Sequence, residues 1–257
     1  MILHSVQAGE GPSVVLLHGL FGSARNFGAV QKALASGSRV IALDLRNHGT
    51  SKQAPVVGYD AMAADVLETL AALDALPAVL IGHSMGGKVA MRAALDRPDA
   101  VSALVVADIA PVTYPPHLRP VVAALAGLEL TPGLSRAQAD AALSPAVPDS
   151  GMRGFLLQNL VLGNRPAWRI GLAEIVAGMP VIEAWNVTGS AYAGPALFIA
   201  GERSNYIQSG HRPLIRAEFP AARFVTLKDA GHWLHADNPA GFLAVLEAFL
   251  AAIRGRS

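Results

Sequence analysis

Short apolar runs, separated by glycine, proline and aspartate, recur along most of this chain and constrain its fold more than any other feature. They lie at residues 13–17, 39–43, 78–81, 103–107, 195–200 and 223–227. Runs that are apolar throughout are typical of parallel strands with both faces buried. Amphipathic helical patterns separate several of them, at 27–35, 59–73 and 86–95, and a further one begins near 238. This alternation predicts an α/β fold with a doubly wound, mostly parallel sheet.

The alternation stops between residues 111 and 184, where prolines interrupt the chain and no strand is predicted. Short helical patches at 118–125, 136–143, 151–161 and 167–177 take the place of strands. Such a long strand-free stretch inside one sheet is typical of a helical insertion that encloses a ligand site. We therefore expect a core domain of residues 1–110 and 186–257, and a helical cap, or lid, of residues 111–185.

The composition argues against several classes of protein. Hydrophobic residues make up 52% of the chain and charged residues 15%, which requires a large buried core. A formal net charge of +1 argues against nucleic acid as a partner, and the lack of cysteine excludes disulfides and thiolate metal sites. No apolar stretch approaches the roughly 20 residues of a membrane span, and the N-terminal region does not resemble a signal peptide. We expect a cytoplasmic protein, and its oligomeric state is left open.

The sequence Gly-His-Ser-Met-Gly at 82–86 stands where a predicted strand ends and a predicted helix begins. A G-x-S-x-G sequence at such a turn projects the serine hydroxyl above the sheet, and its glycines leave room for the neighbouring strand and helix. The N-terminus of the helix also favours developing negative charge. Ser84 is therefore the predicted nucleophile, and the alternative is a glycine-rich turn without chemistry.

A serine hydroxyl needs an adjacent base to become a strong nucleophile. His232 follows the last predicted strand and precedes the last predicted helix. Because the carboxyl ends of parallel strands meet at one edge of a sheet, His232 can reach Ser84 there. His235 is expected to cap a helix or face solvent. The other histidines near motifs are interpreted as structural, namely His83, His18 and His48.

Two residues compete for the acid that orients the histidine. Asp108 follows an apolar strand next to the strand of the nucleophile, and Glu202 is the only acid in the loop after the strand at 195–200. Burying a carboxylate is costly unless a partner satisfies it, so the position of Asp108 favours a histidine partner. We therefore prefer Asp108 to Glu202 as the acid that fixes the imidazole tautomer. In the alternative interpretation, Asp108 caps a turn and Glu202 is a solvated charge.

Acyl transfer also needs backbone donors for the oxyanion of the tetrahedral intermediate. His-Gly-Leu-Phe-Gly at 18–22 follows the first predicted strand, where amides can turn toward the nucleophile. Leu20 is the first choice for one donor and Phe21 the second, and Met85, directly after Ser84, supplies the other. An ordinary glycine-rich turn is the alternative. An acyl pocket is expected from the aromatic side chains Phe21, Trp168, Trp185 and Trp233, although those in the cap can equally form its own core.

Taken together, these motifs occur in the order and spacing of an α/β-hydrolase, and the chain resembles the bacterial YbfF-type esterases and their mitochondrial abhydrolase-domain relatives. The matching segments are HGLFGSARNF at 18–27, DLRNHGTS at 44–51, GHSMGGKVAM at 82–91, ADIAPVTY at 107–114, GERSNYI at 201–207 and AGHWLHADNP at 230–239. In those esterases the acid is the aspartate of the DIAP sequence, which corresponds to Asp108. The resemblance implies hydrolysis of acyl esters or acyl thioesters.

The sequence thus predicts a carboxylesterase-type serine hydrolase that uses Ser84, His232 and Asp108 on small to medium acyl chains, with no metal or organic cofactor. Serine at position 84 argues against haloalkane dehalogenases, which carry aspartate there. A cofactor-free haloperoxidase and a carbon–carbon hydrolase use a similar triad and stay open. A non-catalytic binding protein on the same scaffold is the alternative from a different class.

Overall fold

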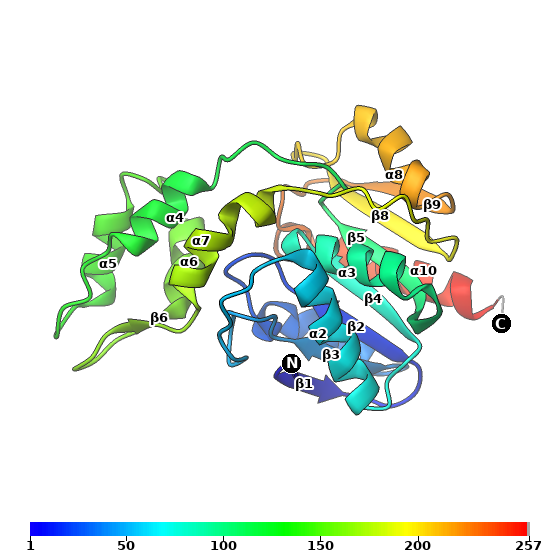
Figure 1. Cartoon of the computed structure of the whole chain (residues 1–257), viewed down its shortest axis with the longest axis horizontal. Coiled ribbons are helices and arrows are strands. Elements are labelled where there is room, and N and C mark those ends of the chain that lie inside the picture. The colour runs from blue at the N-terminus through cyan, green and yellow to red at the C-terminus, as the bar shows by residue number, and fades with distance from the viewer. Residues whose placement is uncertain (256–257) are drawn as a thin grey trace.

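A seven-stranded sheet runs through the centre of the computed structural model, which describes residues 1–255 (Figure 1). From one edge to the other, its strands are β1 (Ser5–Ala8), β3 (Arg39–Leu43), β2 (Ser13–Leu17), β4 (Ala78–His83), β5 (Val101–Ala107), β8 (Ala196–Gly201) and β9 (Ala222–Leu227). Neighbouring strands are parallel except β1 and β3, which are antiparallel. The predicted doubly wound, mostly parallel α/β fold is confirmed.

All six predicted strands are present, and their ends lie within two residues of the predicted ones. The sequence prediction omits β1, whose central residues Val6 and Gln7 are exposed at the sheet edge. An antiparallel edge strand that is half exposed has no apolar run, so the pattern that reveals buried parallel strands is missing there.

Consecutive strand residues point to opposite faces of the sheet, and each face has its own apolar core. On β2, Val15 and Leu17 belong to one core, whereas Val14 and Leu16 belong to the other. The first core is covered by α2 (Tyr59–Ala72), α3 (Met85–Asp96) and α8 (Arg212–Glu218), and the second by α1 (Gly28–Leu34) and α10 (Pro239–Arg254). Figure 1 shows α2 and α3 in front of the sheet and α10 behind it. Among residues 1–255, no helix has both the length and the hydropathy that a membrane span requires.

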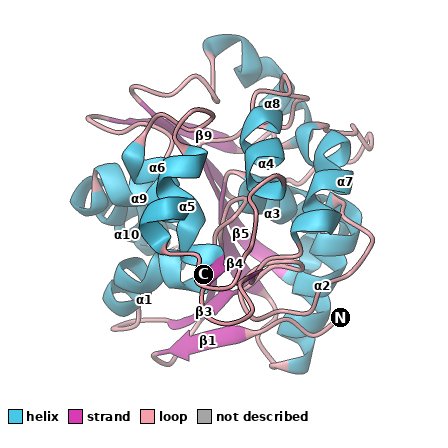
Figure 2. Ribbon diagram, turned by 90° about the vertical axis from the view of Figure 1, so that its left-hand side faces the viewer, coloured by secondary structure: helices cyan, strands magenta, loops and turns pink. Residues whose placement is uncertain are grey.

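Residues 111–185, called the helical segment below, lie to the left of the sheet in Figure 1 and face the viewer in Figure 2. The segment contains α4 (Arg119–Ala126), α5 (Arg136–Leu143), α6 (Ser150–Leu156), α7 (Leu172–Glu183) and a small ribbon of β6 (Leu160–Val161) and β7 (Ala167–Trp168). The prediction that no strand occurs here was wrong, and so was the helical patch at 167–177, which begins as β7. Strands of two residues are too short to give a periodic pattern, so the sequence cannot reveal them.

The C-terminal end of α7 is attached to the core by side chains that bind its last carbonyl groups. The Tyr59 hydroxyl donates to the Ile182 carbonyl at 2.5 Å, and Lys88 Nζ donates to the carbonyls of Glu183 and Ala184 at 3.2 and 2.9 Å. The last carbonyls of a helix have no partner within the helix, so these bonds satisfy groups that burial would otherwise leave unpaired.

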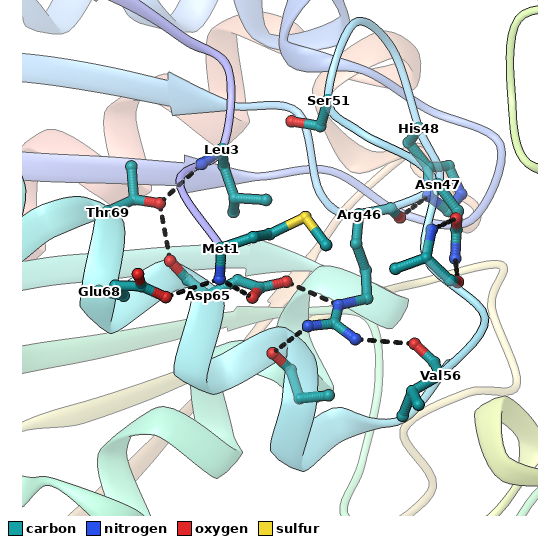
Figure 3. A network of polar contacts seen from close by, with 12 residues as sticks. Met1, Leu3, Arg46, Asn47, His48, Ser51, Val56, Asp65, Glu68 and Thr69 are labelled. Atoms are coloured by element: carbon teal, nitrogen blue, oxygen red, sulfur yellow. Dashed lines mark hydrogen bonds and ion pairs between the residues drawn. The ribbon is translucent and has the colours of Figure 1, made fainter.

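A buried ion pair holds the loop after β3 against α2 (Figure 3). Arg46 Nε contacts Asp65 Oδ2 at 2.6 Å, and the other Arg46 nitrogens donate to the carbonyls of Val56 and Ala61. Both charged side chains are nearly inaccessible to solvent, and each charge is compensated by hydrogen-bonded partners. This network explains the arginine of the DLRNHGTS sequence as a structural residue.

Candidate active site

Ser84 lies at the sharp turn between β4 and α3, with φ of 51° and ψ of −120°. The glycines two residues away on either side are required by close packing. A Cβ on Gly82 would lie 2.1 Å from the Gly86 carbonyl oxygen, and a Cβ on Gly86 would lie 2.3 Å from the Leu17 carbonyl oxygen. The turn therefore has the strand-to-helix geometry expected of a nucleophile elbow.

The structure brings His232 and Asp108 to this serine. His232 Nε2 lies 3.0 Å from Ser84 Oγ, and His232 Nδ1 lies 2.8 Å from Asp108 Oδ2. Ser84, Asp108 and His232 follow β4, β5 and β9, so all three stand at the carboxyl edge of the sheet. The arrangement is an uninterrupted chain of hydrogen bonds from hydroxyl to imidazole to carboxylate, the geometry that activates a serine.

Asp108 is fully buried and surrounded by donors. Its Oδ1 accepts a hydrogen bond from the Gly201 amide at 3.0 Å, and its Oδ2 accepts one from the Ser204 hydroxyl as well as facing His232. Because an ionised carboxylate can accept several hydrogen bonds, these partners offset the cost of burying it.

Glu202, the alternative acid, lies elsewhere. Its side chain is exposed, and its Oε2 accepts a hydrogen bond from the Asp229 amide at 3.1 Å. It therefore stabilises the turn before His232 without reaching the imidazole. Of the two acids weighed from the sequence, the structure brings only Asp108 to the histidine.

Two rings hold the His232 imidazole in place. The Tyr206 ring stacks on it with centroids 4.0 Å apart, and His83 Nε2 bonds the His232 carbonyl at 2.8 Å. Burial lowers the pKa of His83 well below its ordinary value, so the ring is neutral and donates from Nε2. The structural roles predicted for His83, His18 and His48 are confirmed, since His18 and His48 also bond loop carbonyls.

The expectation for His235 was wrong, because this ring neither caps a helix nor faces solvent. It packs 4.9 Å from the Phe27 ring and 5.2 Å, edge-on, from the His83 ring. Burial lowers the pKa of His235 to about 4, so it is neutral near pH 7. It lines the same cavity as His232.

The loop at 18–22 lies directly beside Ser84. A Cβ on Gly19 would lie 3.0 Å from His83 Nδ1 and 3.3 Å from Ser84 Cβ, so a larger residue here would push these side chains away from the loop. The amides of Leu20 and Phe21 make no hydrogen bond within residues 1–255, and the Met85 amide belongs to the unpaired first turn of α3. The loop beside Ser84 and the start of α3 therefore hold three amides with no acceptor among residues 1–255, and the choice between Leu20 and Phe21 as an oxyanion donor stays a prediction.

A cavity of about 190 Å³ opens beside Ser84 and is lined mainly by apolar groups. Phe21 and Trp233 line it, as the sequence prediction expected, together with Met152 and Phe155 of α6, which the prediction did not include. Trp185 and Trp168 are not among its walls, so that part of the predicted pocket was wrong. Trp185 is held outside the cavity wall by a hydrogen bond, because its buried indole N–H donates to Glu218 Oε2 at 2.9 Å.

A second, smaller cavity of about 50 Å³ also borders Ser84. Its walls include Tyr59, Lys88, Tyr114 and Met179. The Lys88 side chain is only 1% exposed, and burial lowers its pKa to about 7. Ser84 thus borders two cavities, and the smaller one has the larger share of polar lining.

The chain is similar to a known protein family, to characterised relatives and to solved structures. Residues 12–239, a range that includes Ser84, Asp108 and His232, match the sequence profile of a family described as "alpha/beta hydrolase fold". The sn-1-specific diacylglycerol lipase ABHD11 of Mus musculus is 43% identical, over 93% of this chain and 81% of its own length. Esterase YbfF of Escherichia coli (strain K12) is 38% identical, over 92% of each chain. A solved structure titled "Marine microorganism esterase" has a TM-score of 0.93 and 34% identity, covering 96% of this chain and 99% of its own.

Proposed function

The chain belongs to the α/β-hydrolase family and is a carboxylic ester hydrolase, and from this premise we propose that Ser84, His232 and Asp108 carry the reaction through a covalent acyl-enzyme. The resemblance to YbfF-type esterases seen in the sequence is confirmed by these relatives. The observation that carries the proposal is the hydrogen-bond chain with distances of 3.0 and 2.8 Å from Ser84 Oγ through His232 to Asp108.

In the first step, Ser84 Oγ attacks the ester carbonyl carbon while its proton moves to His232 Nε2. The carbonyl electron pair moves to oxygen, and the amides of Leu20 and Met85 stabilise the resulting oxyanion, with Phe21 as the second choice to Leu20. Asp108 keeps the imidazole oriented and stabilises its cationic form. Collapse of the intermediate breaks the bond to the leaving oxygen, which takes the proton from His232 and departs as the alcohol.

In the second step, His232 removes a proton from water, and the hydroxide formed attacks the acyl carbon bound to Ser84. Collapse of this second intermediate releases the carboxylic acid and returns the proton to Ser84. Neither step needs a metal or an organic cofactor.

For the substrate, we propose esters of small to medium acyl chains, with acyl thioesters as a further class. The apolar walls of the 190 Å³ cavity, which include Phe21, Phe155 and Trp233, support an acyl group on that side of Ser84. The helical segment supplies Phe155 and Met152, which supports its proposed role as the cap of residues 111–185 over a core of 1–110 and 186–257. A cytoplasmic location stays a prediction from the sequence.

The test is covalent labelling of the purified protein with a fluorophosphonate, read by intact mass beside Ser84→Ala. We expect one adduct on the natural protein and none on the variant, because only an activated serine displaces fluoride from phosphorus. Hydrolysis of p-nitrophenyl esters of increasing chain length then measures acyl preference. A folded protein that forms no adduct and hydrolyses none of the esters contradicts the proposal.

A further inference from the structure

One buried side chain of the helical segment reaches the loop proposed to form the oxyanion hole. Asn159 lies at the end of the 3₁₀ turn η3 (Leu157–Asn159), directly after α6, and is 5% exposed. Its Nδ2 donates to the Phe21 carbonyl at 2.8 Å, across 138 residues of sequence. The same nitrogen contacts the Leu156 carbonyl at 3.3 Å. The amide therefore joins the helical segment to the loop at 18–22.

The peptide held by Asn159 belongs to a strained turn. Phe21 has φ of 63°, a left-handed conformation that is unfavourable for a bulky residue. Such strain persists only where surrounding contacts fix the backbone. The Gly22 amide of this same peptide donates to the Gly19 carbonyl at 3.0 Å. Asn159 thus holds one side of the peptide between Phe21 and Gly22, and Gly19 holds the other.

The Gly19 carbonyl in turn determines where the Leu20 amide points. The Leu45 amide donates to His18 Nε2 at 3.0 Å, so His18 carries its proton on Nδ1, which donates to the Gly19 carbonyl at 2.8 Å. This bond and the one from Gly22 together fix the direction of the Gly19 carbonyl. In a trans peptide the N–H is opposite the C=O, so the same two bonds fix the direction of the Leu20 amide, which has no acceptor among residues 1–255.

From these contacts, we propose that Asn159 is a positioning residue for the oxyanion hole. It acts through the peptide between Phe21 and Gly22 and does not touch the substrate. The inference rests on the proposed function and deepens it, because the helical segment then contributes to stabilising the oxyanion as well as lining the cavity.

The position of Asn159 also links substrate binding to this role. Met152 and Phe155, which line the 190 Å³ cavity, lie on α6, and η3 continues that helix without a break. An acyl group that packs against α6 therefore favours the same placement of the helical segment that brings Asn159 to Phe21. Binding energy from a substrate that fills the cavity is then used to stabilise the transition state.

The experiment compares Asn159→Asp and Asn159→Ala with the natural protein on one p-nitrophenyl ester. The aspartate variant keeps the shape of the side chain but cannot donate to the Phe21 carbonyl. We expect kcat to fall about 10- to 100-fold, below the roughly 10²- to 10³-fold loss that follows outright removal of a donor, with KM within about threefold. The affinity for an aryl boronic acid, whose tetrahedral adduct places an oxygen in the oxyanion hole, should fall by the same factor as kcat.

Gln158→Ala is the matched control, since Gln158 lies on the same turn with an exposed side chain. Fluorophosphonate titration of active sites normalises kcat to the folded, competent fraction, so that poor folding of a variant cannot imitate the effect. The proposal is overturned if both Asn159 variants keep the natural kcat and boronic acid affinity, or if they change KM alone. If the natural protein itself neither reacts with the fluorophosphonate nor hydrolyses the ester, that result contradicts the proposed function instead.

Discussion

Ser204 donates its hydroxyl hydrogen to Asp108 Oδ2, the same carboxylate oxygen that faces His232. Ser204 stands in the loop after β8, whereas Asp108 follows β5, the neighbouring strand. The two loops therefore build the acid site together, one with the carboxylate and the other with a donor that fixes its orientation.

Replacing this donor should weaken the triad without removing it. We expect Ser204→Ala to lower kcat about tenfold and to leave KM within about twofold, because a hydrogen bond to a charged group contributes roughly 1.5–3 kcal/mol and water can replace part of it. Steady-state kinetics on a short p-nitrophenyl ester measures both values. Ser209→Ala, at an exposed position of the 3₁₀ turn that follows this loop, is the control. A Ser204→Ala enzyme with natural kcat would contradict a role in orienting Asp108.

The choice between the two acids gives a second prediction. Asp108→Asn should lower kcat by about 10⁴, since an amide at this position favours the wrong imidazole tautomer. Glu202→Gln should stay within about twofold, because Glu202 is exposed and its Oε2 accepts its hydrogen bond from the Asp229 amide. Kinetics on the two purified variants tests this directly, and equal losses would disprove the assignment of Asp108.

Site residues whose positions are set by the ends of strands could be predicted from the sequence. A serine at a strand-to-helix turn, with a glycine two residues away on each side, is typical of a nucleophile elbow, which singles out Ser84. Parallel topology then brings Asp108 and His232 to the same edge of the sheet. These positions follow from the order of the elements, so no knowledge of side-chain packing is needed.

Residues that depend on packing could not be predicted. Asn159 meets Phe21 across 138 residues, and no periodic pattern marks that contact. Trp185 was expected in the acyl pocket, but its need for a hydrogen-bond acceptor takes it to Glu218. Ser204 stood within the GERSNYI sequence, where only the search for an acid in that loop could have directed attention to it.

The close approach of α3 to β2 gives a prediction about folding. Gly86→Ala should lower the free energy of unfolding by about 3 kcal/mol, because the new Cβ would lie 2.3 Å from the Leu17 carbonyl oxygen and the backbone would have to move. Gly210→Ala is the matched control, since a Cβ there meets no atom of residues 1–255 within 4 Å and should change stability by less than about 0.5 kcal/mol. Urea denaturation of the two variants measures the difference, and equal midpoints would show that the turn tolerates a side chain.

The buried lysine gives a prediction about pH. Lys88 is protonated in the unfolded chain up to its ordinary pKa of 10.5, whereas burial lowers its pKa to about 7 in the folded protein. Between these values the unfolded state binds more protons, so this group makes stability rise with pH, by up to about 3 kcal/mol between pH 7 and 9.5. Below pH 7 both states carry the proton, and the full cost of burying the charge is present.

Lys88→Met should therefore flatten the dependence of stability on pH, because methionine fills a similar volume and has no proton to lose. Urea denaturation at pH 7, 8 and 9.5 measures the free energy of unfolding of both proteins, and the quantity of interest is the change with pH rather than the value at one pH. Lys32→Met, at an exposed position of α1, should keep the natural slope. If the Lys88 variant and the natural protein show the same slope, the folded protein holds Lys88 without the cost that its burial implies, and its contacts with the Glu183 and Ala184 carbonyls are then sufficient to keep it charged.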